Sequence, residues 1–270
     1  MIKLIAVSGI KGGVGAASVA ANLTCAFHQL GQKVVVVDLD CRNCIRTSFS
    51  MAMSDQDGWA VRLHHREDWT LAFHQSPEGI FFLPFGDLSE STLRLEPCEG
   101  TDTFFDADMA YNLIETQPSE IIDTLGCHFD FIILHLPTIT FHPDFSDLLR
   151  SLHISIDLHF MVLNPDVACY SILNTKGKLL RCFPNLKLLS NRCFLNSKVS
   201  GDFIFELQRH WDDFLVSEHI HYDESLSEAA ANLQTVGCYS PDSQAAIEFK
   251  SLALWSLSCL SRVNHVQKIV

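Results

Sequence analysis

The sequence predicts a doubly wound α/β fold, with a mostly parallel sheet of about seven strands and helices on both faces. Its short apolar runs are continuous rather than alternating, as in strands that are buried on both faces. Segments of helical periodicity lie between these runs, and a glycine-rich loop follows the first of them. The expected strands are 4–7, 34–37, 80–83, 131–134, 159–163 and 186–189, with a seventh near 214–216.

The helices are predicted from apolar residues that recur at a period of 3.6. In the first helix Val19, Leu23, Phe27 and Leu30 fall on one face, and Gly31 follows as a stop signal. Further helices are expected at 110–125, 145–152, 168–182, 203–211, 226–233 and 243–260. Neither a linker-like segment nor a repeat divides the sequence, so we predict a single domain over residues 1–270, with a short tail from about residue 263.

The stretch Val7–Ser18, which follows the first apolar run and opens a segment of helical period, resembles a phosphate-binding loop of the form G-x-x-x-x-G-K-[ST]. In such a loop backbone N–H groups hold the phosphates, the Lys neutralises their charge and the hydroxyl binds Mg²⁺. Gly15 stands at the position of the last Gly, but Ala16 replaces the Lys and Ala17 replaces the hydroxyl. The loop therefore predicts weak, largely Mg²⁺-independent binding of ATP, with little or no hydrolysis.

Polar residues follow other strands of the predicted sheet. Ligands of such sheets bind beyond the carboxyl ends of the strands, where Asp38, Asp40 and Asn191 are expected. Each also has a simpler interpretation, because Asp and Asn commonly cap turns and helices at strand exits.

Net charge and cysteine content indicate which partners and which compartment to expect. The net charge is −13, with 32 acidic against 19 basic residues, so no basic footprint for nucleic acid is present and no nucleic-acid partner is expected. The ten cysteines, without a leader pattern at Met1–Leu4 or a long apolar stretch, favour reduced thiols and a cytoplasmic location.

The stretch Lys11-Gly12-Gly13-Val14-Gly15 resembles the deviant Walker A motif, KGGxxK[ST], of the MinD/ParA family of dimeric ATPases. Other segments are similar to the BcsQ (YhjQ) proteins of bacterial cellulose biosynthesis, which are known for altered Walker residues. These segments occur in the right order along most of the chain. They are Val37–Asp40 with Asn43, Arg46, Ser48 and Phe49, then Gly58–Ala60, Asp68–Trp69, Leu83–Gly86, Ile220–Glu224, Ser227–Glu228 and Val236–Gly237.

This resemblance implies roles for individual residues. Lys11 would reach the nucleotide of the other subunit, Asp40 would position the attacking water, and Asn191 would lie near the adenine. His135 stands where the family has its Walker B Asp, and imidazole is a poor Mg²⁺ ligand, so no metal site is predicted. The residues implied to contact the cofactor are Lys11, Gly12, Gly13, Val14, Gly15, Ala16, Ala17, Ser18, Asp38 and Asn191.

Three functions remain open at the level of sequence. The first is a BcsQ-like accessory protein of cellulose secretion, a homodimeric scaffold recruited by other secretion subunits to the inner membrane. The second is an active MinD/ParA-type ATPase for intracellular positioning, with Lys11 and Asp40 as its switch residues. The third is an interaction subunit that no longer binds nucleotide. Binding and turnover of ATP separate these three.

Overall fold

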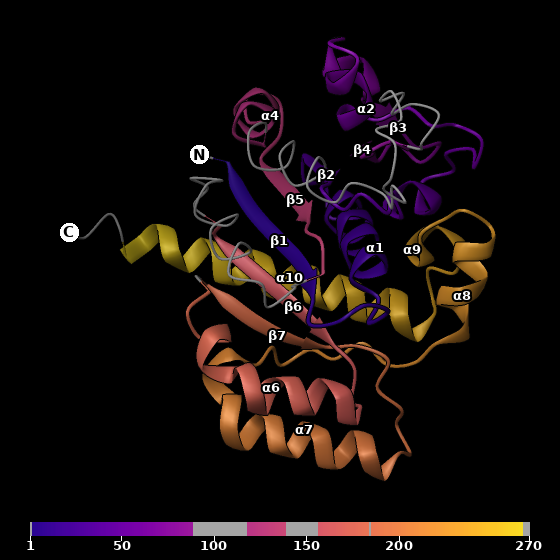
Figure 1. Ribbon diagram of the computed structural model, residues 1–270. Coiled ribbons are helices and arrows are strands. Elements are labelled where there is room, and N and C mark those ends of the chain that lie inside the picture. The colour runs from indigo at the N-terminus through magenta and orange to yellow at the C-terminus, as the bar shows by residue number, and fades with distance from the viewer. Residues whose placement is uncertain (1, 89–117, 139–155, 184, 267–270) are drawn as a thin grey trace, which may run out of the picture.

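The computed structural model describes residues 2–88, 118–138, 156–183 and 185–266 (Figure 1). Its centre is a sheet whose strands are buried along most of their length, because they are continuous runs of Val, Ile, Leu and Phe. The strands are β1 (Lys3–Gly9), β2 (Val34–Asp38), β3 (His74–Gln75), β4 (Phe81–Leu83), β5 (Phe131–His135), β6 (Leu158–Leu163) and β7 (Leu186–Ser190).

The strand order is β3-β4-β2-β5-β1-β6-β7. Every pair is parallel except β3 with β4, which is antiparallel. The register pairs Val7 with His135 and Asp38 with His135, so the ends of β1, β2 and β5 meet at one edge. The prediction of a mostly parallel α/β sheet is confirmed, and the sheet brings the glycine-rich loop beside the acids that follow β2.

The seventh strand differs from the prediction. It is β3, a two-residue edge strand, and not the segment near 214–216. That segment makes only an isolated parallel bridge, between Leu215 and Leu188 of β7, because the chain before it turns as a short 3-10 helix, Asp212–Phe214.

The helices predicted at 168–182 and 226–233 lie within two residues of the observed ones, but α7 begins five residues earlier than predicted, α10 ends six residues later, and the short helices α2 and α9 were not predicted. Acidic or hydroxyl side chains, those of Asp166, Ser197 and Asp223, cap the N-termini of α6, α7 and α8. The helices are α1 (Ala16–Gln29), α2 (Trp59–His64), α4 (Pro118–Leu125), α6 (Val167–Leu180), α7 (Lys198–Trp211), α8 (Glu224–Ala231), α9 (Val236–Tyr239) and α10 (Gln244–Val266).

Two helix predictions lie wholly or partly outside the described residues, and the predicted C-terminal tail overlaps the last described helix. The helix expected at 145–152, and 110–117 of another, lie outside them. The segment predicted as a tail from about residue 263 begins inside α10, which ends at Val266.

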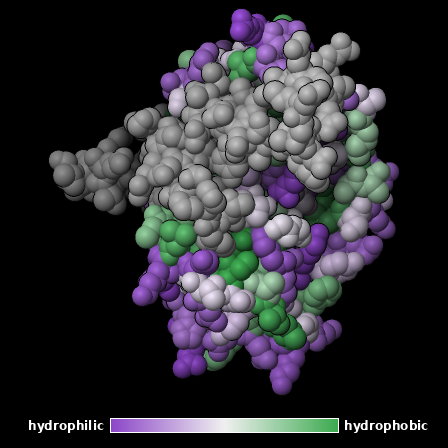
Figure 2. All heavy atoms as spheres, viewed as in Figure 1, coloured by the Kyte–Doolittle hydropathy of each residue, from purple (hydrophilic) through white to green (hydrophobic). Residues whose placement is uncertain are grey.

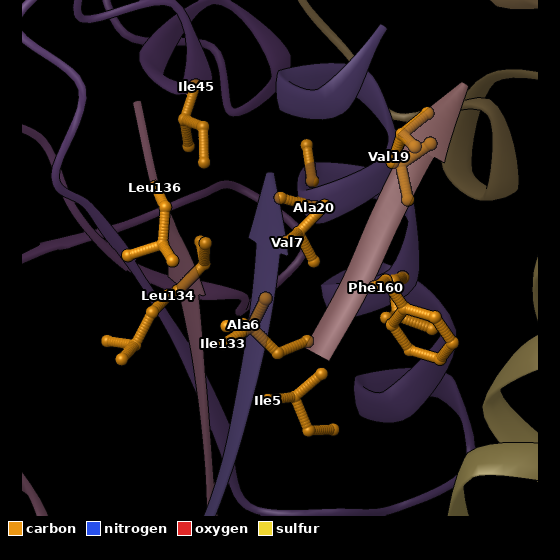
Figure 3. Close-up of a cluster of buried hydrophobic side chains, with 14 of the residues drawn as sticks. Ile5, Ala6, Val7, Val19, Ala20, Ile45, Ile133, Leu134, Leu136 and Phe160 are labelled. Carbon is orange, nitrogen blue, oxygen red and sulfur yellow. The ribbon is translucent and has the colours of Figure 1, made fainter. Parts of the chain in front are cut away.

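The core lies between the central strands and α1. Ile5, Val7, Ile133 and Phe160 point from the strands toward the same cluster as Val19 of α1, and all are fully buried (Figure 3). Helix α10 packs against α1, and its Trp255 contacts Phe160 of β6. The glycine-rich loop therefore connects a strand and a helix that are both packed into the core.

The surface is mixed in character. Over the part where α6 and α7 lie in Figure 1, hydrophobic residues are scattered among hydrophilic ones (Figure 2). Among the described residues no helix is both long and apolar enough to span a bilayer.

Candidate functional site

The glycine-rich loop connects Gly9, the last residue of β1, to Ala16, the first residue of α1. Gly15 is the N-cap of α1 and has a left-handed backbone, with φ +92°. A Cβ at this position would lie 2.6 Å from Nδ2 of Asn191, so both the backbone and the space require glycine. No side chain caps α1, so the first N–H groups of the helix remain available to an anion.

Side chains that follow β7 hold the loop. Nδ2 of Asn191 donates to the carbonyl of Val14 at 2.8 Å, and Nη1 of Arg192 donates to that of Gly13 at 3.2 Å. Asn191 is buried and bonded to the loop backbone, which gives it a positioning role here. Its implied contact with adenine stays a prediction.

Lys11 lies at the tip of the loop and is half-buried. Its Nζ is 3.2 Å from Oδ2 of Asp166, the N-cap of α6. Burial raises the pKa of Asp166, but hydrogen bonds from the N–H of Cys169 and from Lys11 outweigh it, so the net pKa lies below its usual value. Within one subunit Lys11 is therefore already paired with a carboxylate.

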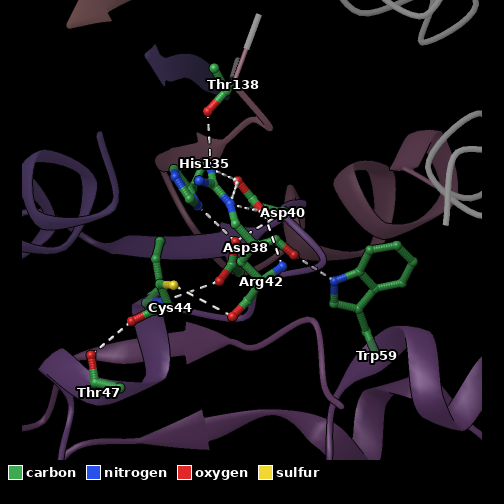
Figure 4. A network of polar contacts seen from close by, with 9 residues as sticks. Asp38, Asp40, Arg42, Cys44, Thr47, Trp59, His135 and Thr138 are labelled. Carbon is green, nitrogen blue, oxygen red and sulfur yellow. Dashed lines mark hydrogen bonds and ion pairs between the residues drawn. The ribbon is translucent and has the colours of Figure 1, made fainter. Parts of the chain in front are cut away.

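Asp38 ends β2 and is fully buried. Its Oδ1 accepts from Nδ1 of His135 at 2.7 Å and from the N–H of Asp40 at 3.0 Å, and its Oδ2 accepts from the N–H of Ile45 at 3.2 Å (Figure 4). The indole of Trp59 donates to the Asp38 carbonyl at 2.8 Å. These bonds shape the loop after β2 and use both carboxylate oxygens.

Asp40 is bound by a neighbour in the same loop. Nε of Arg42 donates to Oδ1 and Oδ2 of Asp40 at 2.9 and 3.1 Å, and Nη2 donates to Oδ2 (Figure 4). Burial raises the pKa of Asp40, but the hydrogen bonds from Arg42 outweigh it, so the carboxyl titrates below its usual range. A carboxylate that is paired in this way is a poor acceptor for a proton from water.

A cavity of about 140 Å³ lies in front of these groups. It brings together six of the residues predicted to bind the cofactor, whereas Gly12, Ser18, Asp38, Asp40 and Asn191 do not line it. Ser18 instead accepts a hydrogen bond from Asn22 at 3.3 Å. The lining residues are Lys11, Gly13, Val14, Gly15, Ala16, Ala17, Arg42, Cys44, His135 and Thr138.

The cavity fits a phosphate group better than a magnesium ion. The loop backbone and two basic side chains, Lys11 and Arg42, surround it. Mg²⁺ needs free oxygen ligands, but Ala17 has no hydroxyl, Asp38 is bonded to His135, and Asp40 is bonded to Arg42. Among the described residues no group of three or more His, Cys, Asp and Glu side chains is placed to hold a metal.

Sequence reasoning missed four residues of this site. Arg42, Cys44 and Thr138 line the cavity, and Asp166 pairs with Lys11. Arg42 could have been suspected from the sequence, because it is a basic residue only two positions after Asp40. Asp166 follows β6, so its contact with Lys11 depends on the adjacency of β1 and β6, which spacing along the chain does not report.

The fold and the loop define a P-loop protein of the MinD/ParA type. The structure is similar to the cell division ATPase MinD of Pyrococcus furiosus, with a TM-score of 0.70 and 21% identity over 97% of this chain and 100% of that one. It is also similar to septum site-determining protein MinD of Pyrococcus horikoshii, solved as a complex with Mg-ADP. Here the TM-score is 0.68, with 22% identity over 94% of this chain and 95% of that one.

The sequence places the chain more narrowly within this class. Residues 2–257 match the family of the cellulose biosynthesis protein BcsQ. The cellulose biosynthesis protein BcsQ of Salmonella typhimurium is 28% identical over 254 residues, which is 94% of each chain. The chain belongs to the BcsQ family, as the resemblance predicted.

Proposed function

We propose that this protein is an accessory subunit of bacterial cellulose secretion, a homodimeric scaffold that binds nucleotide weakly and does not turn it over efficiently. Its place in cellulose biosynthesis is supported by the family and by the BcsQ relative. We propose that it acts in the cytoplasm and is recruited to the inner membrane by other secretion subunits.

One observation carries the catalytic part of this proposal. Asp38 and Asp40, the two acids that follow β2, are both occupied by protein donors, from His135 and Arg42. Ala16 adds no charge at the cavity wall, and Ala17 adds no hydroxyl. Each missing or engaged group removes a transition-state contact that is commonly worth about a hundredfold in rate. The remaining backbone donors still suit a phosphate.

Calorimetry and a turnover assay on the purified protein test the proposal together. We expect weak binding of ATP and ADP, micromolar or poorer, that is the same with Mg²⁺ and with EDTA. We expect ATP turnover far below about one per second, a rate within the normal range of enzymes. Mg²⁺-dependent turnover near that rate, abolished by Asp40→Ala, would instead support an active positioning ATPase. Absence of binding at millimolar nucleotide would support a scaffold that has lost its ligand.

The role in secretion needs a cellular test. In a cellulose-producing bacterium that lacks its own homologue, expression of this chain is expected to restore secreted cellulose. The Gly58→Ala variant, whose fold we expect to be weakened, serves as the loss-of-function comparison. Unchanged cellulose levels with well-expressed wild-type protein would contradict the accessory role.

A further inference from the structure

Arg42 and Lys11 both line the cavity, but Arg42 keeps hydrogen-bond donors that have no acceptor among the described residues. Its side chain is 52% exposed, whereas that of Asp40 is 2% exposed. Nε and Nη2 are bonded to Asp40, and Nη2 also donates to Oγ1 of Thr138 at 3.1 Å. Within the described residues Nη1 has no acceptor, so its two N–H groups stay available beside the cavity. The buried carboxylate thus fixes one edge of the guanidinium and leaves another edge free.

Arg42 lines the same cavity as the position of the P-loop that lacks its usual lysine. Ala16 and Ala17 line the same cavity as Arg42, and Ala16 stands where the P-loop motif places its Lys. That Lys normally meets the β- and γ-phosphates. Hydrogen bonds from a guanidinium to phosphate oxygens are charge-assisted and strong, and Nη1 of Arg42 still has two N–H groups to donate. Here the cation reaches the cavity from the loop after β2 rather than from the P-loop.

We infer that Arg42 is the cation that binds the β- and γ-phosphates of a nucleotide in this cavity, and that Asp40 is the residue that positions it. This inference rests on the proposed binding of nucleotide. Asp40 thereby changes from a group that orients water to one that orients an arginine. No metal ion enters the contact, so the phosphate charge is met by the protein alone.

Nucleotides that differ in their number of phosphates test whether Arg42 contacts the β- and γ-phosphates. AMP carries only the phosphate nearest the ribose, so it cannot make the Arg42 contact. Titrations of ATP, ADP and AMP in EDTA are therefore compared for wild type, Arg42→Gln and Arg42→Lys. Arg62→Gln is the matched control, because Arg62 forms the same kind of pair with Asp57 but does not line the cavity. Urea unfolding of each variant reports its stability.

We expect Arg42→Gln to weaken ATP and ADP binding about tenfold, the usual effect of losing one charged hydrogen bond, and to leave AMP binding unchanged. Arg42→Lys should lose affinity for ATP by only a few fold, because an ammonium keeps the positive charge although Asp40 no longer holds it through two nitrogens. If Arg42→Gln does not fold, the ATP-to-AMP comparison in Arg42→Lys decides the question. Arg62→Gln should bind all three nucleotides as wild type does.

Two results would overturn the inference while nucleotide binding stands. One is ATP affinity that is unchanged in both Arg42 variants, and the other is an equal loss for ATP, ADP and AMP, which would indicate a damaged loop. Wild-type protein that binds none of the three nucleotides at millimolar concentration would overturn the inference and the proposed nucleotide binding together.

Discussion

At the scale of single residues, several buried polar side chains are bonded to one specific partner. Asp38 is bonded to His135, and Ser8 of β1 is bonded to His159 of β6 at 2.8 Å. Burial lowers the pKa of His159 to about 4, so that ring is neutral at physiological pH and packs as part of the core. The thiols of Cys25 and Cys238 form a further pair, with sulfur atoms 3.6 Å apart between α1 and α9.

The pair of thiols leads to a prediction about pH. The hydrogen bond from Cys25 lowers the pKa of Cys238 to about 7, against the opposing effect of burial, and raises that of Cys25. Because the thiolate is the nucleophile, alkylation of Cys238 by iodoacetamide should rise to half its maximum rate near pH 7. Peptide mass spectrometry over pH 6–10 measures the rate for this cysteine alone.

The Cys25→Ala variant removes the hydrogen bond and is the control for this prediction. Without the bond the midpoint should move upward, toward the ordinary value of 9.0. The same midpoint in wild type and Cys25→Ala would show that Cys25 has no influence on the reactivity of Cys238.

At the scale of elements, close contacts between backbone segments fix the position of the short helix α2. Gly58, the N-cap of α2, lies against the segment after β4. The N–H groups of Trp59 and Ala60 donate to the carbonyls of Pro84 and Phe85 at 3.0 and 3.1 Å. This contact places Trp59 where its indole can reach the carbonyl of Asp38. Helix α2 thereby supports the loop of the candidate site.

We therefore expect Gly58→Ala to be strongly destabilising. A Cβ at Gly58 would lie 2.1 Å from the backbone N of Gly86, and backbone cannot move aside cheaply. The free energy of unfolding in urea should fall by about 3 kcal/mol, as for severe overpacking. Gly201→Ala in α7 meets nothing within 4 Å and should raise it by about 0.5–1 kcal/mol, because alanine favours helix. Equal effects of the two substitutions would contradict this account.

At the level of helices, strands and loops, the sequence predicted most strands and the loop of the site but missed the shortest strand and several site residues. Continuous apolar runs identified the six longer strands, and the contiguous P-loop gave the core of the site. Strand β3 was missed because two residues, His74 and Gln75, carry no pattern. The site partners were missed because spacing does not report them. The side chain of Arg42 is directed by Asp40 beside it and by Thr138, which lies 96 residues away.

At the scale of the whole molecule, the position of Lys11 bears on assembly. Lys11 lies on the cavity wall but is paired with Asp166 of its own subunit. If it reaches phosphate on a second subunit, as the family resemblance implies, it must leave Asp166 to do so. Ion pairs near the surface contribute little, about 0–1 kcal/mol, and this pair is partly exposed, so the exchange is feasible.

Lys11→Ala is accordingly expected to weaken the proposed nucleotide binding and, with it, the proposed nucleotide-dependent homodimer. Light scattering of wild type and variant, with and without ATP, gives the masses. Lys187→Ala is the control, because Lys187 donates to the carbonyl of Asp213 and does not line the cavity. If all samples have identical masses, Lys11 plays no part in assembly and other surfaces hold any dimer.

The two ends of the sheet restrict how copies of this protein can join. One end is β3, only two residues long, and beyond the other end Val216 and Ile220 donate to carbonyls of β7. A growing fibre or an added peptide strand needs a long row of unpaired backbone groups, and within residues 2–88, 118–138, 156–183 and 185–266 neither border offers one. On this part of the chain we expect partners to recognise side chains on helices and loops, which single substitutions can alter.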